Sequence, residues 1–240
     1  MMSKKTWAAA AALLAASGTA GAAEFSSTLT AASEYDFRGV SQSAGDPALQ
    51  VSVDLGFDNG LYVGTWASNV DFGGDENIEV DGYLGWAFET GSLGWDVGYT
   101  RYMYPSDGAD ADYDEFYVKA AYGNFGAEIW YAPDYGNTGY ETWYYAGTAD
   151  FELVESWTLS LGLGYQTGEY FEEGWGEGQG AKDGSYWVYS VGVTKTLGNF
   201  DLSLSYLGVD VPEQFRVKDD ILNNENRILF TVSTTLPWGE

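Results

Sequence analysis

Large apolar side chains alternate with small or polar ones along most of the chain. In the segment 48–64, ALQVSVDLGFDNGLYVG, every second residue from Leu49 to Phe57 is large and apolar, and a second run begins at Leu61 after the sequence DNG. A period of two is typical of a β-strand with unlike faces, and Asn-Gly between two such runs is typical of a hairpin turn. The segment therefore predicts a strand, a tight turn and a second strand.

The alternation recurs to the end of the chain and predicts twelve strands in a single domain, with no helical periodicity between them. The connections alternate regularly between long and short. Outer-membrane barrels produce this rhythm, because they combine an even number of strands with short periplasmic turns and longer external loops. The predicted strands are 27–37, 48–57, 61–70, 77–89, 93–104, 114–122, 125–132, 140–151, 157–167, 186–196, 200–209 and 227–236.

The two faces of the predicted strands have different chemistry. In the strand 157–167, the large residues from Trp157 to Tyr165 share one side, whereas Thr, Ser, Gly and Gln share the other. The apolar side either faces lipid or fills the core of a secreted soluble β-sandwich lectin. We expect the first arrangement, an all-β fold that closes as an up-and-down antiparallel transmembrane β-barrel of about 12 strands.

Aromatic residues gather near both ends of the predicted strands, while Val, Leu, Ala and Gly fill most of the middles. Two such levels fit the aromatic girdles at the two interfaces of a membrane, although aromatic residues also favour strands in general. Two basic residues, Arg101 and Lys195, fall on the apolar phase near strand ends, where long side chains reach the head groups. The aromatic residues expected at the membrane interface include Phe57, Tyr62, Trp95, Phe125, Trp157 and Trp238.

The first 23 residues are organised like a secretory signal peptide. Lys4 and Lys5 precede an apolar run from Trp7 to Ala16, and small residues follow in the segment 20–23. This order of a basic, an apolar and a small-residue region is the signature of a cleaved export signal. We expect residues 1–23 to be removed and residues 24–240 to form one barrel domain in the outer membrane of a Gram-negative bacterium.

The composition excludes several kinds of chemistry. The chain has no histidine and no cysteine, which rules out a Ser-His triad, a Cys-His pair and histidine-ligated zinc. Paired carboxylates could in principle make a glycosidase, but no feature singles out one pair among so many. We therefore predict no catalytic residue, no metal site and no cofactor, and we do not expect an enzyme.

The chain is strongly acidic, with 36 Asp and Glu residues against 10 Lys and Arg residues and a net charge of −26. Nucleic acid is not expected as a partner, because phosphates require a positive surface. The acidity is explained either by solubility, including in a saline habitat, or by a field that attracts cations. Composition does not separate these two explanations.

Many charged residues lie on the polar phase of the predicted strands, where a barrel would turn them toward its lumen. Rings of Asp and Glu favour cations, although such charges also pair into structural networks. The segment Asp110-Ala-Asp112-Tyr-Asp114 resembles the start of an EF-hand loop, but Glu115 and Ala121 occupy the positions that need Gly and Glu. The expected pore-lining charges are Glu34, Asp36, Arg38, Asp54, Glu79, Asp81, Asp96, Glu115, Lys119, Glu128, Asp150, Asp201 and Arg227.

Several blocks resemble the Gcw_chp family, the TorF-type porins of proteobacteria. They are YDFRGVSQS (35–43), PALQ (47–50), GLYVGTWASNV (60–70) and the closing ENRILFTVSTTL. The resemblance spans essentially the whole mature chain and implies an outer-membrane barrel with a channel role, without catalytic or ligand residues to carry over. One departure is the end of the chain, where Pro237 and Trp238 follow the last predicted strand instead of a terminal aromatic residue.

The pattern and the resemblance together indicate a porin for passive diffusion of small hydrophilic solutes or ions, with a preference for cations. The alternative is a non-conducting structural or adhesive barrel whose loops bind a partner, for which the loop 168–185 is the candidate surface. The expected partners are outer-membrane lipid and lipopolysaccharide, the barrel assembly machinery, and small solutes or cations. The protein is expected to be a monomer.

Overall fold

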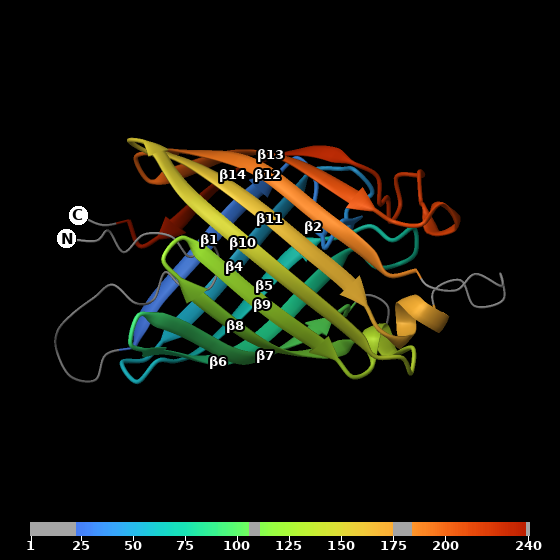
Figure 1. Cartoon of the computed structure of the whole chain (residues 1–240), viewed down its shortest axis with the longest axis horizontal. Helices are drawn as coiled ribbons and strands as arrows, with labels where there is room; N and C mark the ends of the chain where they lie inside the picture. Colours follow the sequence, from blue (N-terminus) through green and yellow to red (C-terminus); the bar gives the residue numbers. More distant parts are fainter. Residues whose placement is uncertain (1–22, 106–110, 175–183, 239–240) are drawn as a thin grey trace.

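The computed structural model describes residues 23–105, 111–174 and 184–238, in which twelve long antiparallel strands close into one barrel (Figure 1). Each strand pairs with its neighbours in the chain, and β1 (Glu24–Ala32) closes the ring by pairing with β14 (Arg227–Leu236). The up-and-down barrel predicted from the alternation is confirmed. The other strands of the wall are β4 (Ala48–Gly56), β5 (Leu61–Asn69), β6 (Ile78–Thr90), β7 (Leu93–Met103), β8 (Tyr113–Tyr122), β9 (Phe125–Ala132), β10 (Thr142–Val154), β11 (Trp157–Thr167), β12 (Tyr186–Leu197) and β13 (Phe200–Asp210).

The first predicted strand, 27–37, is wrong at its end. The strand β1 stops at Ala32, and the chain then leaves the wall to form a small hairpin of β2 (Asp36–Phe37) and β3 (Val40–Ser41). The turn between them uses left-handed backbone at Arg38 and Gly39, with φ angles of 50° and 89°. Alternation alone does not reveal this hairpin, because its residues continue the period of two while pairing with each other.

The outer face of the barrel is apolar and exposed. In β4, Leu49 is 67% exposed, and Val51, Val53 and Leu55 are each exposed by more than a third. The largest fully buried side chains are instead polar, and they include Gln166, Glu79 and Glu115. This inversion suits a barrel in lipid and rules out the soluble sandwich, which would bury the apolar face against a second sheet. Among the described residues, no helix is long and apolar enough to cross a membrane.

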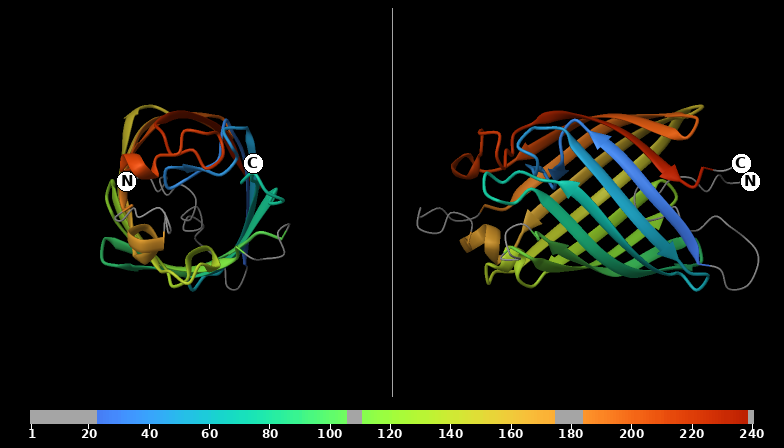
Figure 2. Two further views of the ribbon diagram at one scale, coloured as in Figure 1. Left: turned by 90° about the vertical axis from the view of Figure 1, so that its right-hand side faces the viewer. Right: turned by 180° about the vertical axis from the view of Figure 1, so that it is seen from behind.

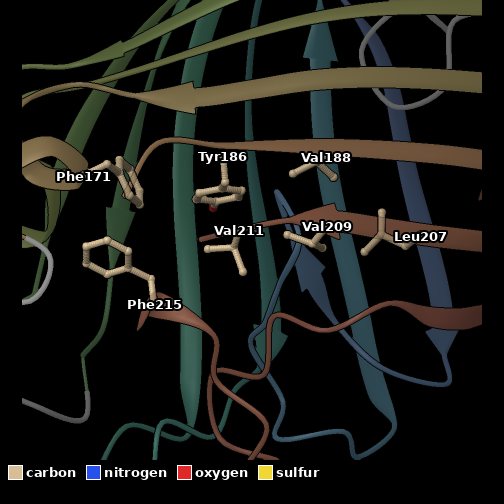
Figure 3. Packing of buried hydrophobic residues seen from close by; sticks show 7 residues of the cluster. All are labelled: Phe171, Tyr186, Val188, Leu207, Val209, Val211 and Phe215. Carbon is tan, nitrogen blue, oxygen red and sulfur yellow. The ribbon is translucent and has the colours of Figure 1, made fainter. Parts of the chain in front are cut away.

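The long-loop end of the barrel is filled from inside. Figure 2 shows the loop after β1 (blue) and the loop after β13 (orange-red) reaching across the mouth of the barrel. A cluster of buried apolar side chains lies beneath them (Figure 3), and two smaller aromatic clusters surround Tyr35 and Tyr102. Three short helical turns of the described residues also lie at this end, namely η2 (Tyr135–Asn137), η3 (Tyr170–Gly174) and η4 (Glu213–Phe215).

Glycine residues on the wall make room for tyrosine rings. A side chain at Gly98 would collide with the ring of Tyr117 and approach the backbone oxygen of Leu84 to 2.7 Å, and Gly164 lies under the ring of Tyr144 in the same way. Covering glycine with an aromatic ring on the next strand is a known way of stabilising a curved sheet. These glycines therefore let the rings lie flat against the wall. The other pairs are Gly64 with Tyr83, Gly85 with Tyr62, and Gly208 with Tyr189.

Candidate functional site

The interior of the barrel is the candidate functional site, and the first loop, residues 33–47, divides it. Gly39 at the tip of this loop packs so closely that an added Cβ would lie 2.9 Å from Val188 and 3.0 Å from Val209. Only glycine fits there, since the position also has left-handed backbone. The backbone oxygen of Arg38 accepts a hydrogen bond of 3.1 Å from the Tyr186 hydroxyl. The loop is thus attached to β12 and β13 on one side of the lumen.

Arg38 reaches from the first loop to the opposite part of the wall. Both of its terminal nitrogens donate to the Glu115 carboxylate of β8, each at 2.7 Å. The guanidinium also lies 4.5 Å from the centre of the Tyr144 ring and 5.4 Å from that of Trp130. Burial is the largest effect on Arg38 and disfavours its charge, but the paired Glu115 carboxylate together with Tyr102 and Tyr113 outweighs burial, and the pKa of Arg38 is raised above its ordinary value. Arg38 is therefore a fixed cation in the middle of the lumen.

A second guanidinium holds the base of the first loop. Arg227 of β14 forms an ion pair with Asp36 and another, at 3.4 Å, with Glu34. Asp36 also accepts a hydrogen bond of 3.1 Å from the backbone nitrogen of Gly39. Burial raises the pKa of Asp36 above its ordinary value, although Arg227 acts in the opposite direction. The loop is held by charge pairs at its base and at its tip.

The short-turn half of the lumen contains a cavity of about 780 Å³. Its lining includes Asp96 and Lys119 on one side and Asp150, Ser160 and Ser190 on the other. Nearly all the lining residues come from the short turns and the adjoining halves of the strands, so the cavity lies on the opposite side of the first loop from the long loops. Its size and the charged and hydroxyl groups of its mixed lining suit water and small hydrophilic solutes.

Polar side chains between this cavity and the first loop form a connected network. The Tyr62 hydroxyl donates to Asp96 at 2.7 Å and also contacts the Tyr117 hydroxyl. The Lys119 ammonium lies 4.5 Å from the Tyr117 ring centre and 4.7 Å from that of Trp130. Arg38 contacts the same Trp130 ring, so this indole lies between the Lys119 ammonium of the cavity and the Arg38 guanidinium of the first loop.

The expected pore-lining charges fall into distinct groups. Those around the first loop are Glu34, Asp36, Arg38, Glu79, Asp81, Glu115 and Arg227, of which Glu79, Asp81 and Glu115 are buried. Those of the short-turn half are Asp54, Asp96, Lys119, Glu128 and Asp150, where Asp54 accepts a hydrogen bond from Tyr83 and Asp150 accepts one from Ser160. Asp201 is exposed and pairs with Thr196 near a short turn. Their part in conduction stays a prediction.

One of the expected interface aromatics is wrongly placed. Tyr62 is 7% exposed and points into the lumen, where it contacts Asp96 and Tyr117. Leu61, the first strand residue after the tight turn, points outward. Successive side chains of a strand point to opposite faces, so Tyr62 must point inward. Four of the other expected residues, Phe57, Phe125, Trp157 and Trp238, are exposed by 40% or more. Trp95 is half-buried beside Thr90, to which its indole donates.

The two basic residues on the apolar phase lie at the ends of their strands. Arg101 pairs with Asp114 at 3.1 Å and with Asp112 at 3.3 Å near the long-loop end. Lys195 lies 5.3 Å from the Trp157 ring centre at the short-turn end. Asp110, the first residue of the EF-hand-like segment, lies outside the described residues, as do residues 1–22 of the expected signal peptide and residues 175–183 of the expected adhesive loop.

Sequence reasoning missed the aromatic part of the lumen. Tyr102, Trp130 and Tyr144 contact the charged centre of the first loop, yet they were not among the expected site residues. The alternation did indicate that these three side chains face the lumen. Each lies an even number of positions along its strand from an expected lumen charge, or from a residue that is paired with one. No signal in the sequence indicated that the first loop would fold inward to meet them.

The family model described as a bacterial protein of unknown function (Gcw_chp) matches residues 16–236. Among solved structures, a KdgM porin is similar with a TM-score of 0.57 at 8% identity, covering 89% of this chain and 99% of that chain. A KdgM porin in complex with disordered oligogalacturonate gives 0.55 at 8% identity, with coverages of 89% and 99%. A NanC porin gives 0.54 at 11% identity, with coverages of 88% and 98%. No curated protein matches the sequence.

Proposed function

The chain belongs to the Gcw_chp family of bacterial proteins of unknown function, and on that premise we propose that it is an outer-membrane channel. It would pass small hydrophilic solutes or ions by passive diffusion, with a preference for cations. The observation that carries the proposal is a cavity of about 780 Å³, lined by charged and hydroxyl side chains among apolar ones, inside a closed barrel whose outer face is apolar. The likeness in fold to KdgM and NanC porins supports the channel class and the outer-membrane location.

The charges of the lumen support the preference for cations. Asp54, Asp96, Glu128 and Asp150 lie in the short-turn half, and Lys119 is the basic residue among the cavity-lining residues there. An excess of carboxylates in a confined space raises the local concentration of cations and lowers that of anions. In the membrane we expect a monomer surrounded by lipid and lipopolysaccharide, inserted by the barrel assembly machinery after removal of the signal peptide.

A second candidate function is a closed structural or adhesive barrel. The observation in its favour is the first loop, which occupies the lumen together with buried apolar residues at the long-loop end. In that case the short-turn cavity would be a blind pocket, and binding would fall to the external loops. We place the channel first because the hairpin of the loop pairs with itself and not with a strand of the wall, so that side-chain contacts and single backbone hydrogen bonds hold the loop in place.

Reconstitution of the purified chain into planar bilayers distinguishes the two candidates. The channel proposal expects discrete conductance steps and, under a salt gradient, a reversal potential of the sign that cation selectivity produces. An absence of steps would contradict conduction, whereas steps with anion selectivity would contradict only the preference. Deletion of residues 170–183 provides the second comparison, because an adhesive barrel would lose partner binding while its electrical behaviour stayed the same.

A further inference from the structure

Two buried carboxylates on β6 lack the partners that their neighbours have. Glu79 is 1% exposed and Asp81 is 7% exposed, and both lie on the lumen side of the strand. The Oε2 atom of Glu79 and the Oδ1 atom of Asp81 have no hydrogen-bond partner. A buried carboxylate oxygen without a partner is costly, so these two atoms indicate a ligand that the protein itself does not supply.

The charges around the first loop do not balance. Arg38 pairs with Glu115, and Arg227 pairs with both Asp36 and Glu34. Among the ion pairs of the described residues, none involves Glu79 or Asp81. Glu79 and Glu115 are instead the charged neighbours of Asp81, so each of them repels a charged Asp81 carboxylate. The region is therefore short of positive charge at the position of Glu79 and Asp81.

The geometry suits one cation bound between two side chains. Residues two apart on a strand point to the same side, about 7 Å apart along it, so both carboxylates can reach a common ion. Neutral oxygen atoms that can also coordinate a cation are close by. The Tyr35 hydroxyl donates to the other oxygen of Glu79 at 3.0 Å, and Tyr104 lies beside the same carboxylate without bonding to Oε2.

We propose that Glu79 and Asp81 form a cation-binding site in the lumen beside the first loop. This proposal rests on the proposed function, because the bound cation would be one that is passing through the channel. Carboxylate and hydroxyl oxygens are the donors that hard cations such as Ca²⁺ select. Within the described residues, no group of three or more acidic side chains is arranged as a metal cage. A site with only two carboxylates binds a cation and releases it again, as conduction requires.

Terbium emission tests the site in the purified full-length barrel. Tb³⁺ occupies calcium sites and emits when nearby aromatic residues transfer energy to it, and the rings of Tyr35 and Trp66, which contact each other at a tilt of 60°, adjoin Glu79. We expect a saturable component of emission that Ca²⁺ competes away. In the double variant Glu79→Gln/Asp81→Asn, the affinity for Tb³⁺ should fall roughly tenfold or more. The double variant is expected to fold, because Glu79→Gln keeps an oxygen that accepts the hydrogen bond from Tyr35.

The matched control is Asp219→Asn/Asp220→Asn, which removes two adjacent carboxylates from an exposed loop outside the wall. It should keep the saturable component. Equal binding in the wild type and in the Glu79/Asp81 variant would overturn the proposal. The absence of saturable binding in the wild type would also overturn the proposal. Infrared spectroscopy would then be expected to find the two carboxyl groups protonated, because a shared proton would occupy the place of the cation.

A second readout separates this site from the channel itself. In planar bilayers, Ca²⁺ should block the potassium current of the wild type, and the block should weaken roughly tenfold in Glu79→Gln/Asp81→Asn. If current flows and the block is unchanged in the variant, the site is wrong and the channel stands. If no current flows but the terbium component still depends on the two residues, the site stands and the proposed function fails.

Discussion

At the scale of single residues, the contact between Arg38 and Glu115 is the attachment of the first loop to β8. Removing one partner of a buried, hydrogen-bonded ion pair leaves an uncompensated charge and costs about 3–5 kcal/mol. The contact is bidentate and its side chains are 8% and 1% exposed, so solvent does little to soften that loss.

We expect Arg38→Met to release the first loop and increase single-channel conductance, because the tip of the loop would lose its attachment to β8. Arg101→Met is the matched control, since Arg101 makes its ion pairs on the outer side near the strand end. Glu115→Met in the Arg38→Met background should recover part of the lost thermal stability, because no buried charge is then left unpaired. Unchanged conductance in Arg38→Met would contradict the proposed role of this contact.

The glycines under tyrosine rings provide a second test at this scale. In Gly98→Ala the added methyl group would meet the ring of Tyr117, and we expect a loss of about 1–3 kcal/mol in the free energy of unfolding. Gly82→Ala is the control, because the nearest atom to its added Cβ is the Met103 Cε at 3.9 Å. Urea unfolding in lipid vesicles measures both. Equal stability of the two variants would argue against close packing of these rings.

At the scale of the strands, alternation determined which face meets lipid. Leu161 lies midway along β11, is 38% exposed, and is flanked by the aromatic residues Trp157 and Tyr165 toward the two ends. We expect Leu161→Arg to cost about 2–4 kcal/mol, because a charge in the middle of the hydrocarbon layer loses its hydration.

Val154→Arg is the comparison for that substitution, since Val154 is exposed beside a short turn where a charge costs only about 0–1 kcal/mol. Unfolding in vesicles should therefore separate the two variants clearly. If both cost the same small amount, water rather than lipid covers the middle of β11, and the transmembrane register proposed here is wrong.

The strands of the wall were predictable because each has one apolar and one polar face, and the period of two does not depend on what covers either face. The hairpin in the first loop was not predictable on this basis, because Asp36 and Phe37 continue the alternation of β1 although they belong to a different sheet. Tyr62 was misjudged for the opposite reason: it lies next to a turn, like the interface aromatics, but on the inward phase.

At the scale of the whole molecule, the first loop separates two regions of unlike chemistry. The short-turn half holds the cavity with its mixed polar and apolar lining, whereas the long-loop half holds buried aromatic and aliphatic side chains around a few paired charges. The sequence indicated the acidic character of the interior through its polar phase. It did not indicate how the interior is divided, because that depends on the contact of Arg38 with Glu115, 77 residues apart, and on that of Arg227 with Asp36, 191 residues apart.

The measurement that tests the account most directly is thiol modification during single-channel recording, which the absence of native cysteine makes possible. Ser190 lines the cavity and Val191 is exposed on the outer face, so Ser190→Cys and Val191→Cys place a thiol on opposite sides of one strand. A charged, water-soluble thiol reagent should reduce the current through Ser190→Cys and leave that through Val191→Cys unchanged. Current that responds in neither variant, or only in Val191→Cys, would contradict conduction through this lumen.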